Sequence, residues 1–185
     1  MAAIPVGARS VLVLGGARSG KSAYAQALAE AAAPERVYLA TAEAGDAEMA
    51  DRIARHRQAR GAGWTTREAP LDLAEALAAE ARAGRVVLAD CLTLWITNLM
   101  LSGRDVEAAT AALARTIGAL EGPAILVSNE VGLALVPETR LGRDFRDLQG
   151  RANAAVAGAC DAVVFVAAGL PTLLKPTPPL DWRLS

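Results

Sequence analysis

The chain has 185 residues, of which 53% are hydrophobic and 21% are charged, and its formal net charge is -1. This composition is typical of a globular protein and excludes a disordered chain, and the low net charge argues against a polybasic nucleic-acid-binding protein. The length fits one domain, which we place at residues 1–175, followed by a proline-containing C-terminal tail at residues 176–185.

The two cysteines, Cys91 and Cys160, lie far apart and match no metal-ligand spacing. We therefore expect two reduced, buried thiols in a cytoplasmic protein. The first ten residues carry no signal-peptide pattern. No stretch reaches the roughly 18 uninterrupted apolar residues of a membrane span. We expect a cytoplasmic protein with no nucleic-acid partner and no stable membrane insertion.

Short apolar runs alternate along the chain with segments of helical spacing. The runs predict strands at residues 11–14, 37–40, 86–89, 124–127 and 162–166. They are continuous rather than alternating, as is typical of strands buried on both faces. The segments between them predict helices at about residues 20–33, 46–60, 71–83, 105–120 and 139–159. This order predicts an α/β fold with a mainly parallel sheet and helices on both faces.

The segment after the first predicted strand matches the phosphate-binding pattern G-x-x-x-x-G-K-[ST] at every fixed position. Its residues are Gly15, Gly16, Ala17, Arg18, Ser19, Gly20, Lys21 and Ser22. A buried strand before it and a helix pattern after it are the context that this chemistry requires, so a chance glycine-rich turn is disfavoured. Backbone N–H groups and the helix N-terminus would hold phosphates. We expect Lys21 to reach the β- and γ-phosphates as a catalytic residue and Ser22 to hold Mg²⁺. The fold class is then a RecA-like P-loop NTPase.

A second ligand for Mg²⁺ should follow a neighbouring buried strand. Asp90 comes directly after the predicted strand at residues 86–89. Two roles remain open for it, and they can coexist. It holds Mg²⁺, directly or through water, or it caps a helix that begins near Leu92.

The loop alone does not identify the class of nucleotide-binding protein. The chain has no [NT]-K-x-D segment for reading guanine, which disfavours a GTPase switch. Leu101-Ser102-Gly103 resembles the start of a transporter ATPase signature, but Arg104-Asp105 does not continue it. Both the GTPase class and the transporter ATPase class are therefore disfavoured.

His56 is the only histidine, and it lies among arginines on the predicted helix at residues 46–60. The residues alone leave two interpretations open. His56 is a surface residue on a solvated basic face, or it lies in a site for a polyphosphate. In such a site a neutral imidazole can attack phosphorus and form a covalent intermediate. Repulsion from the neighbouring arginines would favour the neutral imidazole.

An ordered series of motifs then runs from Val11 to about Lys175. After the phosphate-binding loop come Tyr38-Leu39-Ala40-Thr41, Glu48-Met49, Arg52-Ile53, His56, Trp64, Thr66, Glu68, Asp90-Cys91-Leu92-Thr93-Leu94-Trp95, Asn98, Ser128-Asn129-Glu130-Val131-Gly132, Val136-Pro137-Glu138, Arg140, Arg143, Phe145-Arg146-Asp147, Gly150 and Asn153. This series resembles the bifunctional adenosylcobinamide kinase/adenosylcobinamide-phosphate guanylyltransferase family of cobalamin biosynthesis. The phosphate-binding loop alone is weak evidence of function, whereas the whole series is highly specific.

The resemblance implies two reactions. In the first, the γ-phosphate of ATP or GTP is transferred to the aminopropanol hydroxyl of adenosylcobinamide. In the second, GTP guanylylates a histidine and releases pyrophosphate, and adenosylcobinamide phosphate takes the GMP to give adenosylcobinamide-GDP. The histidine at the guanylylated position is His56. GTP, ATP and Mg²⁺ are the implied ligands, and the family typically forms a homotrimer.

The resemblance also implies further nucleotide-binding residues. Contacts to the nucleotide are expected from Ala40, Thr41 and Ala42 at the end of the second predicted strand, and guanine-nucleotide contacts from Arg57, Gln58, Ala59, Arg60 and Glu68. The Glu68 carboxylate would accept hydrogen bonds from guanine and explain a preference for GTP; otherwise Glu68 is a surface residue. Some relatives have two adjacent histidines, and here the first is Arg55, so only one candidate nucleophile remains.

Polar residues near the next predicted strand remain open in role. Asn129 and Glu130 follow the strand at residues 124–127, at the carboxyl edge where such sheets bind ligands. We expect Glu130 to line the active site, unless it caps the following segment. Arg140, Arg143 and Arg146 either contact phosphates or are solvated.

Two other functions of the whole protein remain open: a small-molecule kinase without guanylyl transfer, and a nucleotide-gated assembly module.

Overall fold

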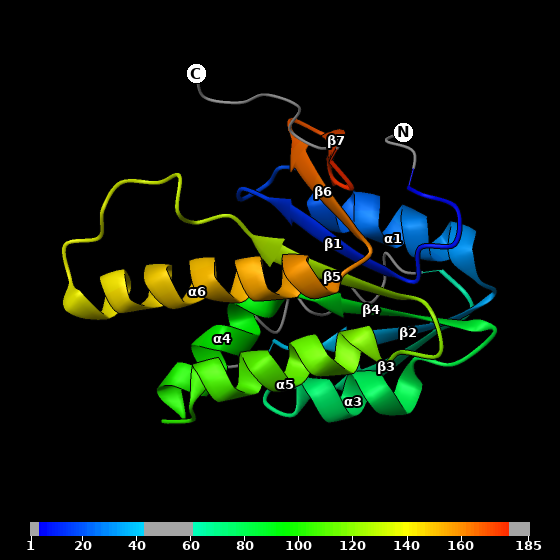
Figure 1. Cartoon of the computed structure of the whole chain (residues 1–185), viewed down its shortest axis with the longest axis horizontal. Coiled ribbons are helices and arrows are strands. Elements are labelled where there is room, and N and C mark those ends of the chain that lie inside the picture. The colour runs from blue at the N-terminus through cyan, green and yellow to red at the C-terminus, as the bar shows by residue number, and fades with distance from the viewer. Residues whose placement is uncertain (1–3, 43–60, 178–185) are drawn as a thin grey trace, which may run out of the picture.

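The computed structural model describes residues 4–42 and 61–177 (Figure 1). The strands of this part of the chain are β1 (Ser10–Gly15), β2 (Glu35–Ala40), β3 (Trp64–Glu68), β4 (Arg85–Asp90), β5 (Ala124–Asn129), β6 (Ala162–Ala167) and β7 (Leu170–Lys175). The helices are α1 (Lys21–Ala32), α3 (Leu73–Glu80), α4 (Leu92–Leu101), α5 (Val106–Gly118) and α6 (Arg140–Ala159). The predicted helix at residues 46–60 lies outside the described residues.

All seven strands form one sheet in the order β3-β2-β4-β5-β1-β6-β7. Every neighbouring pair is parallel except β6 and β7, which are antiparallel. The strand β1 lies between β5 and β6, and all six of its residues are buried. Continuous apolar strands need cover on both faces. The mainly parallel sheet with helices on both faces is therefore confirmed.

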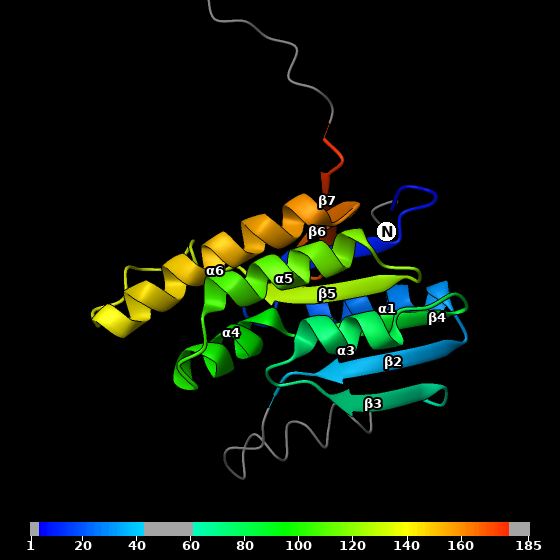
Figure 2. The ribbon, with the colours of Figure 1, turned by 60° about the horizontal axis from the view of Figure 1, so that its bottom comes forward.

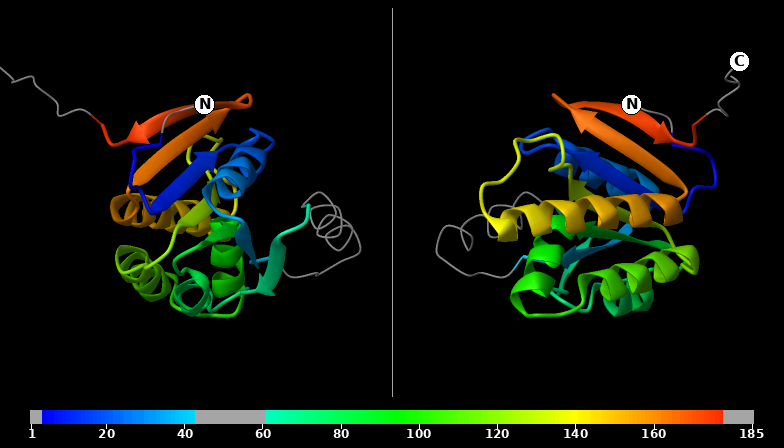
Figure 3. Two further views of the ribbon diagram at one scale, coloured as in Figure 1. Left: turned by 90° about the vertical axis from the view of Figure 1, so that its right-hand side faces the viewer. Right: turned by 60° about the vertical axis from the view of Figure 1, so that its left-hand side comes forward.

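The helices divide between the two faces of the sheet. Helices α3, α4, α5 and α6 pack on one face around a core that includes Leu12, Leu39 and Leu126 (Figure 2). On the other face, Ala25 and Ala29 of α1 pack against Val13 and Val127. Strand β3 and the β6–β7 pair lie at opposite edges of the sheet (Figure 3). Among the described residues, no helix is both long and apolar enough to cross a membrane.

The five predicted strands and the four described predicted helices are present, with shifted ends. The prediction of five strands was incomplete, because it missed β3 and β7. For α4, only a start near Leu92 was predicted, and the rest of the helix was missed. Helix α3 is shorter than the predicted residues 71–83. Cys160 is buried as expected, but Cys91 is only partly buried, and both are free thiols.

Side chains fix several element ends. Asp161 accepts hydrogen bonds from the backbone N–H groups of Arg9 and Ser10 at 2.8 and 2.9 Å, which joins the start of β6 to the start of β1. The Lys175 ammonium donates to three carbonyls at the end of α6, those of Ala157, Gly158 and Cys160. These contacts hold the start of β6 to β1 and the end of β7 to the end of α6.

Candidate active site

The phosphate-binding loop joins the end of β1 to the start of α1. Gly20 is the N-cap of α1 and has a φ of 93°, a left-handed conformation that glycine adopts without strain. A Cβ on Gly15 would lie 2.5 Å from both the Ser19 hydroxyl and the Val166 carbonyl, so this position admits only glycine. Gly16 has open space where its Cβ would be. The loop therefore has the close turns and the open face that a bound phosphate needs.

Backbone contacts brace this loop from two sides. The Ser19 carbonyl accepts a hydrogen bond from the Gly169 N–H at 2.8 Å, in the β6–β7 turn. The Gly15 carbonyl accepts one from the Glu130 N–H at 3.1 Å, directly after β5. The loop is thus held between its two neighbouring strands.

Two polar side chains in the loop fit an anionic ligand. The Lys21 ammonium lies 3.1 Å from the Gly16 carbonyl, so it folds back over the loop. The Ser19 hydroxyl is buried and has no hydrogen-bond partner among the described residues. A buried hydroxyl without a partner costs free energy, which a phosphate oxygen would recover by accepting its hydrogen bond. The donor set fits phosphate.

The strand register places Asp90 at the same edge of the sheet. Asp90 is level with Val127 of β5, which is level with Val13 of β1. At about 4.8 Å per strand spacing, Asp90 lies about 10 Å from β1. The N-cap of α4 is Cys91, so Asp90 is one residue outside the helix and does not fill the capping position suggested for it.

The predicted Mg²⁺ ligands are oxygen donors of the kind that this ion prefers. Ser22 is in the first turn of α1, and Asp90 is at the end of β4. Within residues 4–42 and 61–177, no group of three or more His, Cys, Asp or Glu side chains is arranged to hold a metal ion. A hydroxyl and a carboxylate fit Mg²⁺, which takes one or two protein oxygens together with substrate phosphates and waters.

The residues implied for guanine recognition lie farther along the same edge. Ala40 of β2 is level with both Asp90 and Glu68. Glu68 is exposed at the end of the edge strand β3, about 19 Å from β1 by strand spacing. Thr41 and Ala42 follow β2. The structure brings Ala40, Thr41 and Glu68 together but separates them from the phosphate-binding loop.

Five predicted site residues belong to the segment at residues 43–60. His56 lies outside the described residues, and so do Arg57, Gln58, Ala59 and Arg60. Their roles remain predictions.

The polar residues after β5 engage mainly in local contacts. The Glu130 carboxylate accepts a hydrogen bond from the Gly132 N–H at 2.6 Å, while its own backbone N–H contacts the phosphate-binding loop. Arg143 donates to the carbonyls of Pro137 and Glu138, which fixes the end of the β5–α6 loop. Arg140 pairs with Asp144 at 3.7 Å. Each of these side chains is partly or wholly exposed at this end of the sheet.

Three residues that hold this edge had no role from the sequence. Asn98 donates to the carbonyls of Thr41 and Pro70, which ties α4 to the ends of β2 and β3. The Thr93 hydroxyl accepts a hydrogen bond from the Asn129 N–H at 2.9 Å. Gln149 is fully buried on α6. A polar residue on the apolar face of a helix is the signal that finds Gln149.

The family of this chain follows from comparison with known proteins. The model of the cobinamide kinase / cobinamide phosphate guanyltransferase family (CobU) matches residues 11–174. The chain belongs to this family. The match includes all of β1 except Ser10, the phosphate-binding loop and the carboxyl-edge residues Asp90 and Asn129. The family resemblance of the motif series is thereby confirmed.

Curated relatives agree with the family model. The chain is 50% identical to the bifunctional adenosylcobalamin biosynthesis protein CobP of Pseudomonas aeruginosa (strain PAO1), over 90% of this chain and 98% of the relative. It is 39% identical to the bifunctional adenosylcobalamin biosynthesis protein CobU of Escherichia coli (strain K12), over 89% and 99%. The similarity therefore spans nearly the whole length of these relatives.

One solved structure supports the fold class. A type III secretion system ATPase of pathogenic bacteria superposes with a TM-score of 0.50 at 11% sequence identity. The match covers 89% of this chain and 56% of the ATPase chain, so this chain spans about half of that protein. The predicted α/β P-loop NTPase fold is confirmed, and this neighbour carries no argument about activity.

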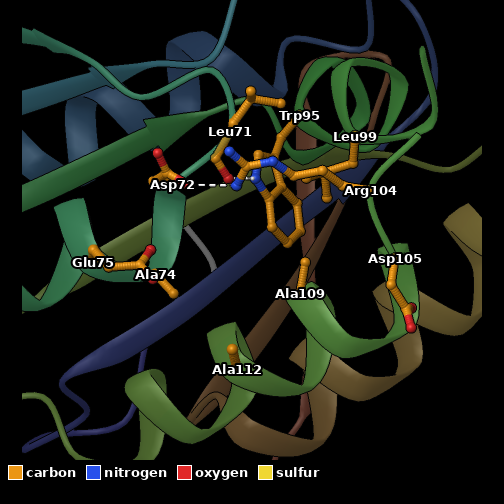
Figure 4. A pocket seen from close by; sticks show the side chains of 10 residues that line it. All are labelled: Leu71, Asp72, Ala74, Glu75, Trp95, Leu99, Arg104, Asp105, Ala109 and Ala112. Carbon is orange, nitrogen blue, oxygen red and sulfur yellow. Dashed lines mark hydrogen bonds and ion pairs between the residues drawn. The ribbon is translucent and has the colours of Figure 1, made fainter. Parts of the chain in front are cut away.

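A separate cavity of about 280 Å³ lies between α3, α4 and α5 (Figure 4). The Trp95 indole N–H donates to the Leu71 carbonyl at 2.8 Å beside it, and Arg104 pairs with Asp72 at 2.6 Å across its rim. None of the predicted nucleotide-binding residues lines this cavity. It is not part of the site at the carboxyl edge.

Proposed function

We propose that this protein phosphorylates adenosylcobinamide with ATP or GTP and then transfers GMP from GTP to adenosylcobinamide phosphate. The product is adenosylcobinamide-GDP. The observation that carries the proposal is the family match over residues 11–174 in a chain whose phosphate-binding loop is fully formed. The names of the relatives, which call both of them bifunctional, support both reactions.

In the kinase reaction, the hydroxyl of adenosylcobinamide attacks the γ-phosphorus of the nucleotide and releases its proton to water. The bond from that phosphorus to the β–γ bridging oxygen breaks, and the nucleoside diphosphate leaves. The phosphates lie on the loop from Gly15 to Ser22, where the N–H groups and Lys21 face the charge that develops on the oxygens. Catalysis by such a loop consists mainly of positioning and electrostatic stabilisation.

Ser22 and Asp90 hold Mg²⁺ in this proposal. An Mg²⁺ ion held there would supply positive charge that offsets the charge developing on the phosphate oxygens. Ser22 belongs to the phosphate-binding loop itself. Asp90 is the last residue of β4, and β5 lies between β4 and β1. The hydrogen bonds between the Thr41 hydroxyl and the Cys91 backbone hold the chain directly after Asp90.

In the guanylyl transfer, a ring nitrogen of neutral His56 attacks the α-phosphorus of GTP and pyrophosphate leaves. The phosphoramidate that forms is then attacked by a phosphate oxygen of adenosylcobinamide phosphate, which takes the GMP and frees the histidine. Contacts to this nucleotide come from Ala40, Thr41, Ala42, Arg57, Gln58, Ala59, Arg60 and Glu68. Glu68 is on β3, far from the phosphate-binding loop, and this position supports a guanine site that is separate from that loop.

The proposal also covers the location, the oligomeric state and the domain bounds of the enzyme. We place the protein in the cytoplasm as a homotrimer, with residues 1–175 as one domain and residues 176–185 as a tail. Size-exclusion chromatography with light scattering tests the trimer.

Labelling with GTP that is radioactive in the α-phosphate tests the proposed function. Wild type and His56→Ala are incubated with this GTP and Mg²⁺, and the protein is precipitated. A phosphoramidate is labile in acid and stable in base, so the label should show both properties. Because His56 is the only histidine, its loss removes every imidazole from the chain.

The outcomes separate the candidate functions. Label on wild type but not on His56→Ala supports guanylyl transfer through His56. No label on either protein, with phosphorylation of adenosylcobinamide retained, indicates a kinase without guanylyl transfer. No label and no phosphorylation, with tight nucleotide binding, indicates an assembly module and contradicts the proposal.

A further inference from the structure

A cluster of three buried polar side chains lies between β5 and α6. Ser128 and Gln149 are fully buried, and Asn153 is 5% exposed. The Ser128 hydroxyl donates to the Asn153 side-chain oxygen at 2.7 Å. The Gln149 amide donates to the Ser128 hydroxyl and to the Asn153 oxygen, both at 2.9 Å. The three side chains form one closed network.

If this network served only to pack α6 on the sheet, it would cost free energy of folding. The Gln149 side-chain oxygen is buried and has no hydrogen-bond partner in the described part of the chain. The same face of α6 packs Ala152 and Val156 on the sheet without polar atoms. An apolar residue at position 149 would avoid the unpaired oxygen, since such an oxygen loses its hydrogen bonds to water without replacement. The polar cluster therefore does something that packing does not require.

The cluster acts on the backbone of Asn129. The Asn153 amide donates to the Asn129 carbonyl at 3.0 Å. The Asn129 N–H donates to Thr93 of α4, so side chains from two helices hold the peptide groups on either side of this residue. Asn129 is the register partner of Gly15. The next N–H, that of Glu130, donates to the Gly15 carbonyl at 3.1 Å. A chain of contacts thus leads from Gln149 to the first residue of the phosphate-binding loop.

We propose that Ser128, Gln149 and Asn153 are positioning residues that hold the end of β5 against the phosphate-binding loop for phosphoryl transfer. This inference rests on the proposed kinase reaction. None of the three touches the nucleotide; they act through Asn129 and Glu130. The phosphate-binding loop accepts one hydrogen bond from the Glu130 N–H after β5 and another from the Gly169 N–H. A shift of the end of β5 therefore moves Gly15 relative to Asp90. Small errors in the placement of phosphates cost a large part of the rate.

The substitution Gln149→Met tests the proposal. Met has a similar length and no polar atom to leave unpaired, so the variant should unfold at the urea concentration of wild type or above it. The kcat for adenosylcobinamide phosphorylation should fall about tenfold or more, and the KM for the nucleotide should stay within about twofold, because the loop residues are intact. Ser128→Ala, which removes one hydroxyl, is a second variant with a smaller expected loss of kcat.

Val156→Ala is the matched control on the same helix. Val156 is fully buried and apolar, so the control should lower the urea midpoint and leave kcat near that of wild type. A merely structural role would give the opposite order, with activity following stability. Equal kcat in Gln149→Met and wild type overturns the proposal, and so does an equal loss of kcat in Val156→Ala.

Amide hydrogen exchange separates this inference from the proposed function. The readout is the exchange rate of the Glu130 N–H without substrate. Faster exchange in Gln149→Met than in Val156→Ala supports the positioning role even if wild type does not phosphorylate adenosylcobinamide, which would refute the proposed function alone. Unchanged exchange in Gln149→Met overturns the positioning role.

Discussion

The Thr41 hydroxyl makes two hydrogen bonds to one residue that lies 50 positions away, Cys91. It donates to the Cys91 carbonyl at 2.8 Å and accepts from the Cys91 N–H at 2.8 Å. Thr41 is fully buried and follows β2, whereas Cys91 follows Asp90 at the end of β4. This pair ties the two strand ends together and so fixes the backbone next to Asp90.

Thr41→Val should therefore weaken both stability and phosphoryl transfer. The variant keeps the shape of the side chain but leaves the Cys91 N–H without its acceptor. We expect a loss of about 1–3 kcal/mol in the free energy of unfolding, and at least a tenfold lower kcat because Asp90 loses its support. Urea denaturation and adenosylcobinamide phosphorylation measure the two effects.

Thr41→Ser is the control for this prediction. Serine retains the hydroxyl and both hydrogen bonds but lacks the methyl group. It should keep most of the stability and most of the rate that Thr41→Val loses. Equal losses in the two variants would show that the methyl group, not the hydroxyl, is what matters.

Lys21→Ala should abolish phosphoryl transfer, with kcat lowered about 100-fold or more. The Lys21 ammonium lies over the loop beside Gly16, where its charge faces the phosphates in the proposed reaction. Initial rates at saturating ATP and at saturating GTP measure the effect. A full rate in this variant would refute the assigned role.

The other lysine of the chain provides the matched control. Lys175 donates to three carbonyls at the end of α6, including that of Cys160 at 2.6 Å. Lys175→Met should lower the free energy of unfolding by about 1–3 kcal/mol. Its kcat should stay near that of wild type, because Lys175 is at the end of β7 away from the β6–β7 turn that contacts the phosphate-binding loop.

The central strands could be predicted from the sequence because burial on both faces makes them continuously apolar. The edge strands lack this signal. In β3, the residues from Trp64 to Glu68 are all partly or fully exposed. Strand β7 contains Pro171 and lacks a continuous apolar run, so its sequence does not indicate a strand. Helix α4 is apolar on several sides, which hides the helical period.

The phosphate-binding loop could also be predicted, because its chemistry lies in eight consecutive residues. The contacts that brace the site could not, since they join distant segments. The bond from Gly169 to Ser19 needs the β6–β7 turn, and that from Glu130 to Gly15 needs β5 beside β1. Only the order of strands in the sheet brings these residues together.

Glu68→Gln should lower the preference for GTP over ATP in nucleotide transfer. In the proposed site, the carboxylate accepts hydrogen bonds from the N1–H and N2–H₂ of guanine, and an amide replaces one acceptor with a donor. A bidentate contact of this kind is worth about 1–3 kcal/mol, so the ratio should fall about tenfold. Labelling rates with the two nucleotides give this ratio.

Glu121→Gln is the control for Glu68→Gln. Both carboxylates are exposed, but Glu121 precedes β5 and so lies at the opposite end of the sheet. It should leave the ratio unchanged. A ratio in Glu68→Gln equal to that of wild type would assign Glu68 to the surface instead.

Asp161→Asn should change how stability depends on pH. Burial acts to raise the pKa of Asp161, but hydrogen bonds from Arg9 and Ser10 outweigh it and lower the pKa below its ordinary value. The folded state therefore favours the carboxylate. Its contribution is complete above the unfolded pKa of about 4 and is lost as pH falls through the lower folded pKa.

At pH 7, Asp161→Asn should be less stable than wild type by about 1 kcal/mol, a value reduced by the exposure of the side chain to solvent. The difference should begin to shrink as pH falls below about 4, where the unfolded carboxyl is protonated, and should vanish below the lower folded pKa, where the folded carboxyl is also neutral. Urea denaturation from pH 3 to pH 7 measures it. Asp144→Asn, which removes only an exposed ion pair with Arg140, is the control and should show almost no difference. A constant difference between Asp161→Asn and wild type across this range would mean that hydrogen-bond geometry, rather than charge, joins β1 to β6.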